Sequence, residues 1–534
     1  MDASSNPARL TARPTSLLLL LALLVAAVFS PSAERAAAAA TPAKPADSFV
    51  ESIGVNTHTA YTDTAYGSGF EQVKQRLSEL GVRHIREVLV PERPDQYQRL
   101  NELAGMGIRS TLVLGSPVDG SEGLSELVST ASTQLGGSID AVEGPNEYDS
   151  SGEPGWAPRL AEYQQQLYAD VKGNPALSGL PVIGPSIVQR SNQESIGDIS
   201  GSLDYGNIHP YPGGEPPESN IESQLGRAAL NSGGKPVVAT ESGYHTAIHS
   251  TEEHAPVSET AMAVYMPRLF LSYFESGVAR TFAYELVDEK PNPGLDEPES
   301  NFGLLKNDFS EKPAFVALRN LIAILEDPGP AFAPSSLAYS VGGDTSDLHR
   351  VLLQKRDGSF YLALWRASSA WDVGQQAPVT AAAEPVELEL PAQTERVDRY
   401  LPNRSPAPVD SPKPSPGQPL RVAVGPEVVI LRVQLGAAPL GRIHVWVPRH
   451  TVRAGARVAV HGRLPGSPQR SLRVRIQRWH HGWRTVGHTR TTRSGIFRKK
   501  IRVPAHPDLR TPRLRVVAPL AKPSRPVRLH IRRH

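Results

Sequence analysis

Short apolar runs alternate with longer amphipathic segments from about residue 49 to residue 327. The longer segments, such as 70–80, 158–172 and 259–274, carry apolar residues at spacings of three and four, which predicts helices. Alternation of this kind is typical of βα units and a parallel sheet, and eight repeats predict a (β/α)8 barrel. The eight runs that predict strands are Phe49–Asn56, His84–Val90, Ile108–Leu114, Ile139–Gly144, Pro181–Ile187, Tyr205–His209, Val237–Glu241 and Ala279–Leu286.

An open doubly wound sheet produces the same alternation, so a second observation is needed. A nucleotide-binding sheet of that type carries a Gly-rich phosphate loop after its first strand. Here Gly54, inside the first apolar run, is followed by Val-Asn-Thr-His. We therefore expect a (β/α)8 catalytic barrel over residues 45–328.

The pattern changes after Pro328-Gly-Pro330, where the amphipathic segments end. Segments such as 349–355 and 359–365 alternate with a period of two and are separated by turn residues, which predicts strands. They predict a β-sandwich over residues 332–436, interrupted by a Pro/Ser-rich loop at 402–419. The predicted fold class is thus α/β, a (β/α)8 TIM barrel followed by an all-β sandwich and a small, basic all-β module.

The N-terminus has the order of a secretory signal peptide. Arg9 and Arg13 precede an apolar run at 17–29, and an Ala-rich stretch at 36–40 offers cleavage sites. The run is too short for a comfortable membrane span, although an uncleaved anchor is the alternative interpretation. We expect residues 1–40 to be removed and the protein to be secreted, without membrane attachment. The chain has no cysteine, which excludes disulfides and thiolate metal sites.

The C-terminal residues are strongly basic. Residues 437–534 hold 24 Lys and Arg and one acid, Asp508, a formal charge of about +23 that leaves the rest of the chain at about −21. A field of this strength should attract polyanions, such as an acidic polysaccharide or an anionic cell-wall polymer. Nucleic acid satisfies the same electrostatics, but secretion makes it the less favoured partner.

The basic residues also follow a strand pattern. Arg alternates with apolar residues in 471–478, which on a strand directs one charged face outward. High net charge disfavours folding, but four large side chains offer a small core: Trp446, Trp479, Trp483 and Phe497. The segment 441–534 resembles the immunoglobulin-like modules that follow secreted actinobacterial enzymes.

Two glutamates carry the candidate chemistry of the barrel. Glu147 follows the fourth predicted strand and Glu241 ends the seventh, so both belong at the C-terminal face, where such barrels place their active sites. A single Glu at a strand end is usually a solvated loop residue. Two at matching ends match the carboxyl pair of a retaining glycosidase, in which one group attacks the sugar and the other protonates the leaving oxygen.

At these residues the chain resembles the clan A glycoside hydrolases, with the general build of family 39 and family 5 relatives. Asn146-Glu147 after the fourth strand and Glu241 at the end of the seventh match that clan's motif. The resemblance implies that Glu147 is the acid/base, that Glu241 is the nucleophile and that Asn146 holds the sugar 2-hydroxyl.

Further positions extend the resemblance over residues 49–325. Arg86 is similar to the clan's nucleophile-supporting Arg, and His209-Pro-Tyr211 is similar to its His-x-Tyr after the sixth strand. Arg86 and Tyr211 are then expected to keep Glu241 ionised. Tyr284-Glu285 stands where the clan often has a Trp as a sugar platform, so an aromatic ring is kept in a different shape. The interpretations of Arg86 as a structural ion-pair partner, and of His209 and Tyr211 as ordinary barrel residues, remain open.

Other carboxylates lie near the predicted mouth of the barrel. Glu143 falls within the fourth strand and is interpreted as structural. Glu285 and Asp288 are expected to contact substrate, and Glu285 is the substitute nucleophile if Glu241 does not serve.

A metal-dependent hydrolase is a separate hypothesis. His245, His249 and His254 follow the seventh strand, but their spacings of four and five match no zinc motif. We therefore expect neither a metal nor another cofactor, and interpret this loop as a lid that contacts substrate.

The expected function is a secreted retaining glycoside hydrolase that cleaves the O-glycosidic bonds of a polysaccharide or oligosaccharide by double displacement. The alternative from another class is a catalytically inactive carbohydrate-binding protein of the cell surface, with the basic module as its binding end.

Overall fold

The computed structural model describes residues 40–252, 254–415, 417–436, 441–465, 471–492, 494–503, 511–519 and 521–532. The predicted signal peptide, residues 1–40, lies outside the described residues except for Ala40. Within the described part of the chain, none of the helices is long and apolar enough to cross a membrane.

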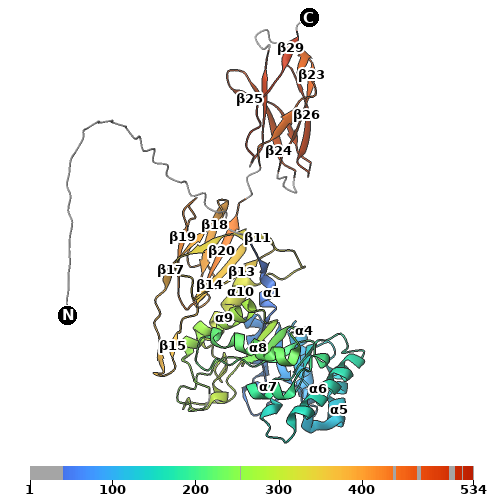
Figure 1. The fold of residues 1–534 in the computed structure, drawn as a ribbon, viewed down its shortest axis with the longest axis vertical. Helices are drawn as coiled ribbons and strands as arrows, with labels where there is room; N and C mark the ends of the chain where they lie inside the picture. Colours follow the sequence, from blue (N-terminus) through green and yellow to red (C-terminus); the bar gives the residue numbers. More distant parts are fainter. Residues whose placement is uncertain are drawn as a thin grey trace, which may run out of the picture. The chain divides into compact units, whose positions relative to one another are not determined.

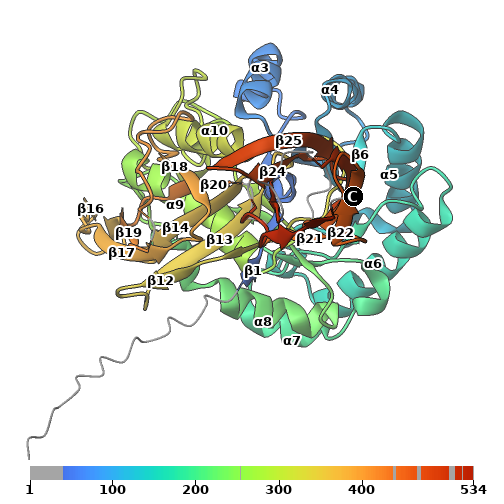
Figure 2. The ribbon, with the colours of Figure 1, turned by 90° about the horizontal axis from the view of Figure 1, so that it is seen from above.

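Eight parallel strands form the predicted barrel, and the fold class is confirmed (Figures 1 and 2). Hydrogen-bonded neighbours run from β7 through β6, β5, β4, β3, β10 and β9 to β8, and a parallel bridge between Ile183 and Tyr205 joins the two ends. The strands are β3 (Ile53–Asn56), β4 (His84–Val88), β5 (Arg109–Val113), β6 (Ile139–Glu143), β7 (Val182–Ile183), β8 (Gly206–Ile208), β9 (Val237–Ser242) and β10 (Arg280–Ala283).

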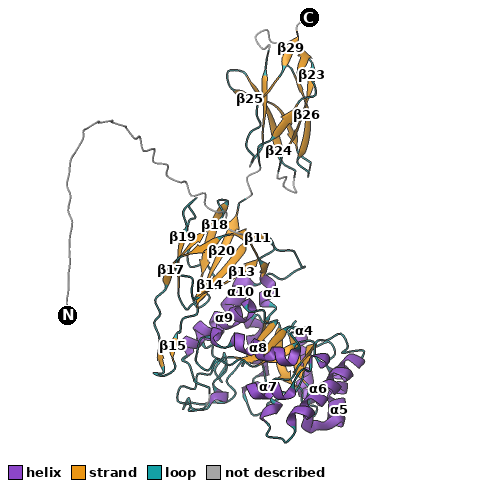
Figure 3. Cartoon of the chain, viewed as in Figure 1, coloured by secondary structure: helices purple, strands orange, loops and turns teal. Residues whose placement is uncertain are grey.

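Helices surround this sheet (Figures 2 and 3). Helix α3 illustrates why they form: it buries Val73, Leu77 and Leu80 on one face and ends at Gly81, whose φ of 83° a glycine adopts without strain. The helices are α2 (Ala65–Ser68), α3 (Phe70–Leu80), α4 (Pro94–Gly105), α5 (Gly120–Gln134), α6 (Trp156–Gly173), α7 (Arg190–Ile196), α8 (Ile221–Ser232), α9 (Glu259–Glu275) and α10 (Pro313–Leu325).

The first predicted strand is wrong at its beginning. Residues Ala46–Val50 form helix α1, and the strand starts only at Ile53. Ala46, Phe49 and Val50 are the buried residues of α1, and their spacing of three and four is helical rather than alternating. The short helix lets the Phe49 ring pack edge-on against Phe274 at 5.3 Å.

The barrel interior is filled by a small apolar cluster. Ala141, Ile183, Val238 and Phe282 form this cluster, each from a different strand. Gly54 is required opposite it, because a Cβ at that position would overlap the ring of Phe282. A packed interior confines access to the ends of the strands.

The β-sandwich follows α10 and takes in residues from the start of the described chain. Its five-stranded sheet has the order β18 (Thr394–Tyr400), β20 (Val429–Leu435), β14 (Phe360–Arg366), β13 (Leu348–Gln354), β2 (Lys44–Pro45). Its three-stranded sheet has the order β12 (Ser340–Gly342), β17 (Glu384–Glu389), β19 (Leu420–Val424). Short pairs are β1 (Ala40–Pro42) with β11 (Ser336–Ala338), and β15 (Trp371–Asp372) with β16 (Ala377–Pro378).

A buried polar cluster joins the barrel to the sandwich. Arg268 of α9 pairs with Glu218 at 2.6 Å, and the indole of Trp365 in β14 donates to the same carboxylate at 2.7 Å. Because Arg268 and Trp365 are fully buried, each needs the partner that Glu218 supplies.

The basic module is all-β in its described residues. One sheet has the order β21 (His444–Trp446), β23 (Arg457–Arg463), β26 (Ile496–Arg502). A two-stranded sheet pairs β22 (Thr451–Arg453) with β29 (His530–Arg532). A four-stranded sheet has the order β25 (Trp483–Arg490), β24 (Arg473–Trp479), β27 (Arg513–Val517), β28 (Val527–Arg528). Strand β24 alternates as expected, because Arg473 and Arg475 are exposed while Val474 and Ile476 are buried.

The predicted core of the basic module is only partly right. Phe497 is buried, but Trp446 and Trp479 are 48% and 44% exposed. Aliphatic side chains such as Val460 and Ile476 form the core instead, because they lie at the buried positions of their strands.

Candidate active site

Glu147 and Glu241 lie at the C-terminal face of the barrel and approach each other. Together with His209 they form a group whose carboxylate oxygens and imidazole nitrogen all lie within 4.8 Å of one another. Glu241 belongs to β9, Glu147 follows β6 by four residues, and His209 follows β8 directly. The Glu147 side chain is 34% exposed and the Glu241 side chain 12%, so the first is the more open to solvent.

Arg86, from β4, organises the interior of this face. Its Nε and Nη2 donate to the two oxygens of Glu143 at 2.6 and 2.8 Å, and its Nη1 donates to Glu241 Oε1 at 2.6 Å. The remaining donors reach the side-chain oxygens of Asn56 and Asn146 at 3.1 and 2.7 Å. The buried guanidinium therefore pairs with one structural carboxylate and one that faces the mouth.

Glu241 is held in its ionised form. Tyr211 donates its hydroxyl proton to Glu241 Oε2 at 2.7 Å, while Arg86 occupies Oε1. Burial alone would raise the pKa of Glu241, but the charges of His209 and Arg86 and these hydrogen bonds lower it to about 2. An ionised carboxylate with both oxygens oriented is the form that a nucleophile requires.

The loop that carries Glu147 is tightly constrained. Gly144 follows β6 where a Cβ would overlap the Gln164 side chain, so only glycine lets the chain pass. Glu147 has φ 46° and ψ 33°, a left-handed conformation uncommon for a residue with a side chain. Its N–H donates to the Ser186 hydroxyl at 2.9 Å. Such conformations are found where the surrounding structure fixes a functional side chain.

His209 connects Glu147 to the interior. Its Nδ1 lies 2.6 Å from Glu147 Oε1, and its Nε2 lies 2.9 Å from the Thr240 hydroxyl. That hydroxyl donates to Asn207 Oδ1 or Glu143 Oε1, at 2.8 and 3.0 Å, so it accepts a proton from Nε2. Burial alone would lower the pKa of His209, but the charge of Glu241 and the contact with Glu147 raise it.

Aromatic rings form one wall of the mouth. Tyr284 lies 5.2 Å from Phe302 and 6.4 Å from Tyr211, measured between ring centroids, and its hydroxyl donates to Glu299 at 2.8 Å. The peptide bond between Tyr284 and Glu285 is cis. His58, after β3, stacks on Tyr61 at 4.7 Å and meets Tyr284 edge-on at 5.6 Å. Sugars bind against such rings through their apolar faces.

The remaining predicted carboxylates are buried. Glu285 has no exposed surface and accepts a hydrogen bond from Tyr66 at 2.9 Å, and burial together with Glu289 raises its pKa well above the ordinary value. Asp288 pairs with Lys312 at 2.8 Å. Asp288 therefore acts as an ion-pair partner within the fold, and its contact with substrate stays a prediction.

The His-rich loop after β9 reaches the site at one point. The His254 ring lies 5.1 Å from that of Tyr211. His245 bonds to the carbonyl of His254 at 2.6 Å, while His249 bonds to the carbonyl of Gly294 at 2.7 Å. Since two of the three imidazoles already bond to backbone oxygens, the loop is held by its own chain.

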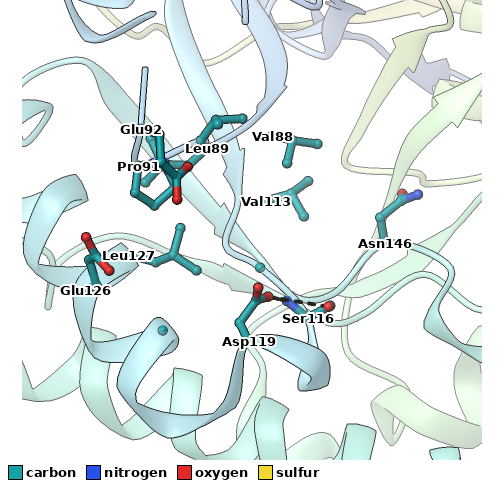
Figure 4. Close-up of a pocket in the computed structure, with 13 residues that line it drawn as sticks. Val88, Leu89, Pro91, Glu92, Val113, Ser116, Asp119, Glu126, Leu127 and Asn146 are labelled. Atoms are coloured by element: carbon teal, nitrogen blue, oxygen red, sulfur yellow. Dashed lines mark hydrogen bonds between the residues drawn. The ribbon is translucent and has the colours of Figure 1, made fainter. Parts of the chain in front are cut away.

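A pocket of about 390 Å³ has Asn146, the chain neighbour of Glu147, in its lining (Figure 4). Loops after β4 and β5 and helix α5 supply its wall, so it lies over the second, third and fourth strands of the barrel. Its polar lining is mainly acidic, and one of these acids, Asp119, accepts the Ser116 N–H at 2.6 Å. The lining is Val88–Glu92, Val113, Gly115, Ser116, Asp119, Gly123, Glu126, Leu127 and Asn146.

Sequence reasoning did not find several residues of this site. Asn56 ends the first strand and His58 follows it closely, so their positions along the chain could have indicated a place at the barrel mouth. Thr240 precedes Glu241 directly and gives no such signal, because its role depends on contact with His209 across two strands.

No protein-family profile matches the sequence, and no curated protein matches it. Among solved structures, the chain is similar to Gas2p of Saccharomyces cerevisiae in complex with laminaritetraose and laminaripentaose, at 13% identity and a TM-score of 0.36. That match covers 52% of this chain and 64% of the Gas2p chain. An apo mutant of Gas2p matches at 13% identity and a TM-score of 0.37, over 55% of this chain and 66% of that one.

The chain thus spans slightly less than two thirds of the Gas2p chains that it matches. Likeness at this level carries no inference about activity.

The network predicts the response of His209 to loss of its neighbour's charge. Glu241→Gln removes a negative charge that raises the pKa of His209, so that pKa should fall. Titration of His-labelled protein by NMR measures it directly. His349 is the internal control, because its pKa is raised by Glu275 and should not change. An unchanged pKa of His209 in the Glu241→Gln variant would contradict this charge coupling.

Proposed function

We propose that this protein is a retaining glycoside hydrolase that uses Glu241 as nucleophile and Glu147 as acid/base. The observation that carries the proposal is the approach of one carboxylate oxygen of Glu147 to one of Glu241, which lie within 4.8 Å of each other. Retaining enzymes place these groups about 5 to 5.5 Å apart, whereas inverting enzymes separate them by about 6.5 to 9.5 Å to admit a water. The pair sits where TIM barrels hold their chemistry.

The reaction follows two steps in this proposal. Glu241 attacks the anomeric carbon while the glycosidic C–O bond breaks, and Glu147 gives its proton to the departing oxygen. Glu147 then takes a proton from water, whose oxygen attacks the same carbon and releases Glu241. The ionised state of Glu241 and the greater exposure of Glu147 suit these two roles.

His209 supplies a place to hold the acid's proton. Thr240 fixes a proton on Nε2, which leaves Nδ1 facing Glu147 Oε1 at 2.6 Å. A single proton on that contact can belong to Glu147 or to His209. Arg86 holds the amide oxygen of Asn146, which leaves the amide nitrogen as a donor for a sugar hydroxyl.

The substrate we propose is a polysaccharide or oligosaccharide. The aromatic wall around Tyr284 offers a face for one sugar unit, and the pocket beyond Asn146 offers space for others. At about 390 Å³ that pocket is of ordinary ligand size.

Loss of the nucleophile should abolish turnover. Glu241→Ala is expected to lower reducing-sugar release by at least about 10³-fold. The measurement uses a panel of soluble polysaccharides, laminarin among them, together with aryl glycosides. Binding of sugar by the unmodified protein without turnover anywhere on the panel would instead favour the inactive carbohydrate-binding protein.

The acid/base assignment has a different signature. Glu147→Gln should slow hydrolysis of natural glycosides by about 10² to 10⁴-fold. The first step of aryl glycoside hydrolysis should slow much less, because a good leaving group departs without a proton from the acid. The two rates are compared in single-turnover assays. Glu153→Gln, an exposed neighbour on the same loop, should change neither. Equal losses on both substrates would remove Glu147 from this role.

We also propose that the enzyme acts outside the cell and that its basic module holds it on an anionic polymer. The described residues of the module carry no acid, since Asp508 lies outside them. Exposed Arg473 and Arg475 on β24 and exposed Lys499 and Lys500 on β26 support this proposal.

Binding to such a polymer should depend on salt. Affinity for dextran sulfate is expected to fall linearly with salt on logarithmic axes, because bound cations are released from the polyanion. Combining Arg473→Gln with Arg475→Gln should weaken binding and lower the slope by about two. Neutral dextran is the control polymer in the same assay. Affinity that ignores salt would exclude an electrostatic partner.

A further inference from the structure

A second convergent group lies beside the catalytic pair and shares no residue with it. It consists of His58, Glu285 and Glu289, whose imidazole nitrogen and carboxylate oxygens all lie within 4.8 Å of one another. His58 comes from the loop after β3, and the two glutamates come from the segment after β10. The group therefore joins two loops of the barrel mouth.

Two of its atoms are buried without a hydrogen-bond partner among the described residues. These are Nε2 of His58 and Oε1 of Glu285. The other oxygen of Glu285 accepts from Tyr66 and lies 3.4 Å from the His58 nitrogen, in a geometry that makes no hydrogen bond. Buried polar atoms are nearly always satisfied, so an unpartnered donor set points to a missing ligand.

We propose that His58, Glu285 and Glu289 bind a divalent transition-metal ion of the Zn²⁺ type. Two ligands of one tetrahedral zinc, each about 2.1 Å from it, lie about 3.4 Å apart. An imidazole with two carboxylates suits Zn²⁺ or Mn²⁺, whereas Ca²⁺ and Mg²⁺ select sites built from oxygen alone. Tyr66 orients the Glu285 carboxylate from behind, as a supporting residue does in metal sites.

A small ion fits these observations better than a sugar does. The unpartnered atoms of His58 and Glu285 are closed off from solvent, so a sugar hydroxyl does not reach them. Glu289 is only half-buried and gives the ion an open side.

The catalytic group offers a useful contrast. Glu147, His209 and Glu241 converge as closely, but each already bonds to a partner in the network around Arg86 and Thr240. Of these two groups, only the His58 group holds buried atoms that lack a hydrogen-bond partner among the described residues. We assign the ion a positioning role: it fixes the loop after β3 against the loop that carries Tyr284.

The test is a titration of full-length protein with Zn²⁺ after removal of metals by a chelator. Isothermal calorimetry should find one tight site, and Glu285→Gln or Glu289→Gln should weaken it by at least about tenfold. Glu153→Gln is the matched control, because Glu153 is exposed on the loop after β6, outside the group, and should leave the site unchanged. Exposed histidines of the basic module contribute only weak sites that all variants share.

Thermal unfolding gives a readout that does not depend on hydrolysis. Zn²⁺ should raise the Tm of the unmodified protein and of Glu153→Gln, but not that of Glu289→Gln. If Glu285→Gln fails to fold, Glu289→Gln still decides, because its side chain is half-exposed. Equal Zn²⁺ affinity in all variants, or tight binding of Ca²⁺ in place of Zn²⁺, would overturn the proposal.

Discussion

The buried charge of Arg86 is the interaction on which the candidate site depends. All five of its N–H donors are used, by Glu143, Glu241, Asn56 and Asn146. Breaking such a buried pair costs about 3 to 5 kcal/mol, because the partner is left as an uncompensated charge. A lysine has too few donors and the wrong shape to replace it. The polar layer at the top of the barrel is thus built around one planar group.

That layer gives the two glutamates different environments. Glu241 receives hydrogen bonds from Arg86 and Tyr211 and is kept ionised. Glu147 is more open and has His209 as its close partner. Two carboxyl groups divide acid and nucleophilic roles when their surroundings differ in this way. Below them, the apolar cluster around Phe282 closes the barrel, so the chemistry is confined to its mouth.

The strand pattern was readable from sequence because eight buried strands leave eight apolar runs. It was misleading at Phe49, because Phe49 and Val50, which are buried residues of helix α1, joined a strand run. It was also misleading at Trp446 and Trp479, because size and apolarity do not say which face of a strand is covered. The close approach of His58 to Glu285 could not be predicted from the sequence, because 227 positions separate them.

The sequence by itself determined the order of strands, the glutamates at the ends of two of them, and the basic charge of the last module. These are local properties, because they depend on spacing along the chain. Only the tertiary structure decided that Arg86 contacts Glu143 as well as Glu241, and that His209 meets Glu147. Arg86 and Glu241 lie 155 residues apart in the chain. Only closure of the barrel sets which inward-facing side chains of different strands lie at the same height along its axis.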